Sequence, residues 1–186
     1  MEKILLQENG LQENCSVCGN KLTRFGSKVL KDGMLCRNCA KLASEWFEDA
    51  DFAEMTVEQI KEHLAYRQKN REKLAEFKGN KVVDGKYSLY IDDESKDFLI
   101  SKRADYVKDN ADLFNISEIS KVRIVERKYL NKDGSDVCVQ LFVRHPQFST
   151  MKFQVNEFSC LNKDSEEYKQ SLKQAYECVN ALKERR

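Results

Sequence analysis

Four cysteines near the N-terminus form two closely spaced pairs. Two residues separate Cys15 from Cys18, two separate Cys36 from Cys39, and seventeen lie between the pairs. Structural zinc takes four tetrahedral ligands, and cysteine thiolates are among those it prefers. The spacing therefore predicts one zinc ion bound by all four. Four thiolates would fill the coordination shell, which favours a structural role, because catalytic zinc keeps an open position.

Two other interpretations of the cysteines stay open at this point. The pairs could hold iron, in an iron–sulfur or rubredoxin-like site, but nothing else in the sequence supports redox use. They could also be four ordinary buried thiols, which the paired spacing makes a poor explanation. Zinc binding would contribute about 10–16 kcal/mol of apparent free energy, and a segment of about 35 residues cannot bury enough apolar surface to fold without such help.

The elements needed to position the cysteines are visible around them. Gly19 directly follows Cys18 and allows a tight turn with positive φ. Asp32-Gly33 is a tight-turn signal that predicts a hairpin between the pairs. After Cys36, apolar residues recur at helical spacing. Turn, hairpin, then helix bearing the second pair is the order of a treble-clef zinc module.

A connector and a helix are expected next. Residues 48–55 are acidic and predict a short connector. Thr56 and Gln59 have the spacing of a capping box, which predicts a helix from there to about Phe77. The polar run 68–71 interrupts its apolar stripe, so we expect this helix to be half exposed.

From residue 81 the hydrophobic period changes from 3.6 to 2, which indicates strands. A final amphipathic helix is predicted over 164–184. The predicted fold class is α+β: a zinc module, a connecting helix, and an antiparallel sheet or barrel with a C-terminal helix. The strands are expected near 87–91, 98–101, 122–130, 137–144 and 151–155. The predicted divisions are a tail 1–12, a zinc module 13–50, a connector and helix 51–80, and a β domain 81–186.

The remaining candidates for chemistry favour structural roles. Cys138, Cys160 and Cys178 are expected to be buried thiols. A catalytic cysteine needs a nearby base, and we interpret the two histidines, His63 and His145, as surface residues. No phosphate-binding or nucleophile motif is present. The sequence thus predicts a protein that is not an enzyme.

Charge and targeting signals narrow the function classes further. The 186 residues carry a net charge of +1, and residues 1–55 carry 7 basic and 9 acidic side chains, which argues against a dedicated nucleic-acid binder. The N-terminus has a three-residue apolar run, far short of a signal peptide or a membrane span. We therefore expect a cytoplasmic protein, in which paired cysteines bind metal before they form disulfides.

The segments Cys15-Ser-Val-Cys-Gly19 and Phe25 to Cys39 resemble a bacterial family of unknown function. That family is defined by an N-terminal four-cysteine module with the layout CxxCG…KDGxxCxxC. The resemblance covers about residues 13–50 and implies zinc binding by the four cysteines. It implies nothing about an activity, because the function of that family is uncharacterised. The rest of the chain is loosely similar to bacterial pleckstrin-homology-like domains, which implies two curved antiparallel sheets and a C-terminal helix that plugs the barrel.

Three functions fit these features. The favoured one is a non-enzymatic adaptor that binds a protein partner. The second is a nucleic-acid binder that directs the basic residues around the hairpin toward phosphates: Lys21, Arg24, Lys28, Lys31 and Arg37. The third, by analogy with the second domain, is lipid binding. The oligomeric state does not follow from the sequence.

Overall fold

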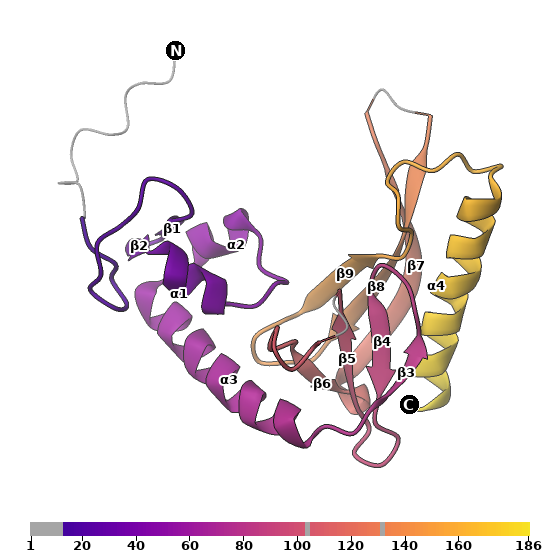
Figure 1. The fold of residues 1–186 in the computed structure, drawn as a ribbon, viewed down its shortest axis with the longest axis horizontal. Helices are drawn as coiled ribbons and strands as arrows, with labels where there is room; N and C mark the ends of the chain where they lie inside the picture. The colour runs from indigo at the N-terminus through magenta and orange to yellow at the C-terminus, as the bar shows by residue number, and fades with distance from the viewer. Residues whose placement is uncertain (1–12, 103–104, 131–132) are drawn as a thin grey trace. The chain divides into compact units, whose positions relative to one another are not determined.

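The computed structural model describes residues 13–102, 105–130 and 133–186. The chain forms two compact units, one ending at Lys69 and the other beginning at Asn70 (Figure 1). The predicted N-terminal tail, residues 1–12, lies outside the described residues. Each unit is considered by itself.

The first unit contains the predicted turn, hairpin and helix in that order. Strands β1 (Lys28–Leu30) and β2 (Gly33–Leu35) pair antiparallel, with Leu30 opposite Gly33. The two-residue loop therefore falls on Lys31 and Asp32, and Gly33 begins the second strand. Helix α1 (Arg37–Leu42) follows directly. The hairpin and helix expected between and after the cysteine pairs are confirmed.

The expected acidic connector is a helix. Residues Asp49–Glu54 form α2, and the Glu48 N–H donates to the Asp51 carboxylate at 2.7 Å. An acidic residue three positions after the start of a helix satisfies a free N–H at its end. Phe52 on α2 is 4% exposed and packs beside Leu30 and Ile60. The sequence indicates only a connector here, because six residues are too few to show a helical period.

Helix α3 (Val57–Glu76) begins at the predicted capping box. The Gln59 N–H donates to the Thr56 hydroxyl at 3.2 Å, and the Thr56 N–H donates to the Gln59 side chain at 2.8 Å. The polar run 68–71, which interrupts the apolar stripe of this helix, is not fully exposed, because its residue Asn70 is only 2% exposed. The Asn70 amide donates to the Ala111 carbonyl at 2.8 Å and accepts from the Leu113 N–H at 2.9 Å.

The second unit contains two antiparallel sheets and the C-terminal helix. One sheet has the order β3-β4-β5-β6 and the other β7-β8-β9. Helix α4 (Glu166–Glu184) packs against β8, β7 and β3. The strands are β3 Asn80–Val83, β4 Ser88–Ile91, β5 Asp97–Ser101, β6 Leu113–Asn115, β7 Ile119–Lys128, β8 Ser135–Val143 and β9 Thr150–Gln154. The α+β class is confirmed, and the sheets do not close into one hydrogen-bonded barrel within the described ranges.

Two edge strands, β3 and β6, were not anticipated. The strands expected from the sequence include neither of them, yet Phe114 of β6 pairs with Phe98 of β5 and both side chains are fully buried. Short edge strands carry too few residues for a period-2 pattern to appear. Each of them forms by pairing with a neighbouring strand, β3 with β4 and β6 with β5, and not because of a pattern within its own few residues.

Candidate metal centre

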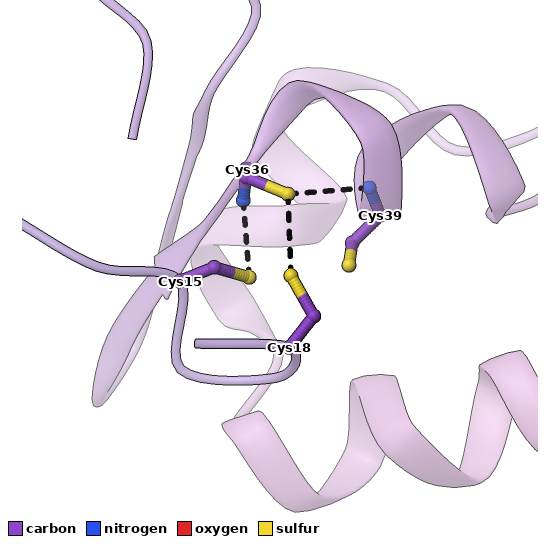
Figure 2. Close-up of side chains that lie close together, drawn as sticks. All are labelled: Cys15, Cys18, Cys36 and Cys39. Carbon is purple, nitrogen blue, oxygen red and sulfur yellow. Dashed lines mark hydrogen bonds between the residues drawn. The ribbon is translucent and has the colours of Figure 1, made fainter. Parts of the chain in front are cut away.

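The four paired cysteines come together at one point in the first unit. Their Sγ atoms all lie within 4.8 Å of one another. Cys15 and Cys18 come from the turn before the hairpin, and Cys36 and Cys39 from the start of α1 (Figure 2). The Sγ atoms of Cys18 and Cys36 are 3.7 Å apart. Tetrahedral zinc with Zn–S bonds of about 2.3 Å places its sulfurs about 3.8 Å apart, so the cluster has the size that the ion requires.

Backbone N–H groups fix the orientation of the sulfur atoms. The Cys36 N–H donates to the Cys15 Sγ at 3.3 Å, and the Cys39 N–H donates to the Cys36 Sγ at 3.5 Å (Figure 2). The first turn closes through the Gly19 N–H, which donates to the Cys15 carbonyl at 2.9 Å, with Gly19 at φ +74°. That backbone angle is strained for side chains other than glycine. The local sequence therefore sets the ligand geometry.

The thiols affect one another electrostatically. Burial raises the pKa of Cys15, but hydrogen bonds from the Cys18, Cys36 and Val17 backbone outweigh it and bring the pKa to about 6. Burial raises the pKa of Cys39, and the neighbouring Cys18 and Cys36 thiols raise it further. Four clustered thiols cannot all ionise without a compensating charge. A divalent cation at their centre would supply that charge.

The cysteine cluster is buried on the side that faces the protein core. Cys15, Cys36 and Cys39 are 3–6% exposed, whereas Cys18 is exposed. These three buried cysteines are part of one apolar cluster with residues from the hairpin, the end of α1, α2 and α3: Leu30, Leu35, Ala43, Phe52 and Ile60. The packed cluster around these cysteines thus continues into α3 through Ile60.

His63 on α3 holds the end of α1 in place. It is completely buried, and its Nε2 accepts from the Ser44 N–H at 3.1 Å. Its ring centre lies 4.4 Å from that of Phe47. The prediction of a surface histidine is wrong here. The position three residues after the buried Ile60 could have indicated the buried face of the helix.

The other predicted thiols and histidine lie in the second unit. Cys138 and Cys178 are buried as expected, and burial raises the pKa of Cys178 to about 12. Cys160 is only partly buried, so the expectation of a buried thiol is wrong for it. His145 is half-buried and stacks on Phe148, and burial lowers its pKa, so it is not the predicted surface residue.

A buried carboxylate in the second unit was missed. Asp136 is 0% exposed and accepts hydrogen bonds from Arg127, Tyr129, Asn156 and the Cys160 N–H. Burial raises its pKa, but the donors outweigh this effect and hold the pKa below the ordinary value. These partners come from three separate segments, which the local sequence does not connect. Because these groups satisfy one another's hydrogen bonds, we interpret this network as structural.

Residues 13–63 match the model of a domain of unknown function, DUF4428. The matched range contains all four cysteines and ends at His63, so it extends beyond the predicted module of 13–50. The resemblance to a family of unknown function with an N-terminal cysteine site is thus confirmed. No curated protein and no solved structure matches the chain. The pleckstrin-homology-like resemblance therefore stays a prediction.

Among the helices in the described part of the chain, none has the length and apolar character needed to cross a bilayer.

Proposed function

We propose that this protein is a non-enzymatic cytoplasmic adaptor whose first unit is held together by one structural zinc ion and binds a protein partner. The observation that carries the proposal is the convergence of four thiol sulfurs within 4.8 Å. Cys15, Cys18, Cys36 and Cys39 would be the four ligands. The bound ion would supply folding free energy and a compensating charge for the thiolates.

A structural ion explains the site better than a catalytic one. Four protein thiolates complete a tetrahedral shell, so no position remains for water or substrate. Three of the sulfurs belong to residues that are buried within the apolar cluster. The surface that the ion stabilises, rather than the ion, would then contact other molecules.

Two of the three thiols outside the cluster support the proposal of a non-enzymatic role. A nucleophilic cysteine needs a lowered pKa and access to solvent. Cys138 and Cys178 are 1% exposed, and burial raises the pKa of both. Their environment is that of inert core residues.

Affinity capture with matched variants tests the adaptor role. The tagged full chain, loaded with zinc, is used as bait in extract from its own organism, beside Cys36→Ser and the control Cys160→Ser. We expect the wild type and Cys160→Ser to recover the same partner, and Cys36→Ser to lose it. Equal recovery by Cys36→Ser, or recovery of nothing specific by the wild type, contradicts the proposal.

A further inference from the structure

The charges of the first unit are divided between two stretches of chain. Residues 20–37, which include the hairpin, carry five basic side chains and one acidic one. Residues 45–58, which include α2, carry six acidic side chains and no basic one. The near-zero net charge of the chain hides this division.

Two of the hairpin charges already have partners. Lys28 forms an ion pair with Asp49, and Asp32 accepts from the Val57 N–H at 2.7 Å. The other four basic side chains are exposed and form no ion pair with the described part of the chain: Lys21, Arg24, Lys31 and Arg37. Their uncompensated charge is available to a partner.

An exposed aromatic ring lies among these charges. Phe25 is 77% exposed, and the Arg24 guanidinium lies 5.8 Å from its ring centre. Gly26 has φ +83°, and the aliphatic stem of Arg37 lies against it, since a Cβ there would be 2.9 Å from the Arg37 Cγ. Arg24, Phe25 and Arg37 therefore form one patch, called the Phe25 surface below.

We propose that the Phe25 surface is the docking site for an acidic segment of the protein partner that presents an apolar side chain. This inference rests on the adaptor role proposed above. Arginine and aromatic side chains dominate the energetics of protein interfaces, and the flanking guanidinium groups pair with carboxylates in a directed, bidentate geometry. The exposed ring supplies the apolar contact at the centre.

The charge division favours a short acidic segment over a nucleic acid. A nucleic acid carries phosphate charge along its whole length. The acidic stretch 45–58 and the site with four thiolates, which lie in the same small unit, would repel that charge. A local cluster of carboxylates needs only the few exposed basic residues of the hairpin. A nucleic acid is therefore the alternative that the test must distinguish.

The test measures peptide binding to the zinc-loaded full chain by fluorescence anisotropy. The probe is a short synthetic peptide of glutamates with a central Leu-Phe pair. The comparison probes are a glutamate peptide without the apolar pair, the same design with lysines, and single-stranded oligothymidine. We expect only the first probe to bind well, and its affinity to fall as salt rises.

Matched variants locate the site. We expect Phe25→Ala to weaken binding about tenfold or more, as loss of an interface hot spot does, and Arg24→Glu with Arg37→Glu to abolish it. Phe158→Ala, at 73% exposure in the second unit, and Lys173→Glu with Lys183→Glu on α4 should leave binding unchanged. Zinc content, measured for every variant, should stay at the wild-type value.

Three results would overturn the inference: no binding of the acidic peptide, equal binding by Phe25→Ala, or Phe25-dependent binding of oligothymidine in preference to the peptide. Affinity capture separates this failure from failure of the adaptor role. If Phe25→Ala still recovers the partner that Cys36→Ser loses, the docking site is wrong and the adaptor role stands. If the wild type recovers no partner, the adaptor role itself fails.

Discussion

The two units solve the same electrostatic problem in different ways. Each buries groups that are anionic when ionised: the clustered thiols of the first unit, and Asp136 of the second. Asp136 is surrounded by donors from its own chain, including Arg127 and the Cys160 N–H. The Cys15 and Cys36 thiols accept long backbone N–H contacts of 3.3 and 3.5 Å, whereas Asp136 has a guanidinium among its donors. The second unit thus compensates its buried carboxylate from its own chain, whereas the thiol cluster of the first unit has an arrangement that a metal cation could complete.

The two units also differ in how much of their buried core consists of apolar side chains. The second unit buries large side chains from two sheets and a helix, among them Phe98, Phe114 and Leu141. The buried cluster of the first unit has eight members, of which three are the metal-site residues Cys15, Cys36 and Cys39. Removing the ion should therefore affect one unit far more than the other.

Chelation is expected to have the largest effect. Stripping zinc removes about 10–16 kcal/mol of apparent binding free energy, so the first unit should unfold while the second stays folded. Hydrogen exchange resolved along the chain, before and after chelator, checks this. Amides of β1, β2 and α1 should lose protection, and those of β8 should keep it. Loss of protection in both units alike, or in neither, would show that the two units do not differ in their dependence on zinc.

Asp136→Ala should produce the reverse pattern. It leaves the Asn156 amide and the Cys160 N–H without their acceptor, which costs about 1–3 kcal/mol for each buried donor. The Arg127 side chain is 45% exposed and stays hydrated. Denaturant unfolding of the second unit should report this loss, while zinc content stays unchanged. Asp133→Ala, an exposed carboxylate on the same hairpin, is the matched control. An equal loss of stability in both variants would show that the buried network around Asp136 makes no specific contribution to folding.

Acid should weaken the second unit through the same carboxylate. The folded-state pKa of Asp136 lies below its unfolded value of about 3.9. Its contribution is therefore fully present above about pH 4 and is lost as the pH falls through the folded-state pKa. The difference in unfolding free energy between wild type and Asp136→Asn should shrink over that window. A constant difference from pH 6 down to the acid transition would refute this assignment.

Asn70→Ala should destabilise the second unit by about 1–3 kcal/mol. The substitution leaves the Ala111 carbonyl and the Leu113 N–H without their hydrogen-bond partner in a buried place. Urea unfolding with the exposed Gln68→Ala as control provides the measurement. A change no larger than that of the control would mean that the loop before β6 does not depend on the helix.

The smallest expected effect is that of Thr56→Ala. It removes the side-chain oxygen that accepts the Gln59 N–H at the start of α3, and loss of such a cap costs about 1 kcal/mol. Thermal unfolding of the zinc-loaded first unit within the full chain should shift downward slightly. Glu58→Ala, exposed in the same turn, should leave the transition nearly unchanged. The reverse ranking would contradict the capping geometry.

The features predictable from the sequence are those that adjacent residues determine. The cysteine pairs, the hairpin between them and the cap at Thr56 each depend on residues within a few positions of one another, and each is found in the structure, although the hairpin loop falls on Lys31-Asp32. The features missed depend on distant partners. Asn70 is buried because residues near 111 lie against it, and His63 because the chain at Ser44 does. A polar residue on a helix gives no local sign of either contact.

The most direct measurement of the central claim is zinc stoichiometry combined with X-ray absorption at the zinc edge, on the purified full chain. The account predicts one zinc per chain, coordinated by four sulfur atoms at about 2.3 Å, and no zinc in Cys36→Ser. A metal-free chain whose first unit is fully folded would contradict it, as would a zinc ion with fewer than four sulfur ligands.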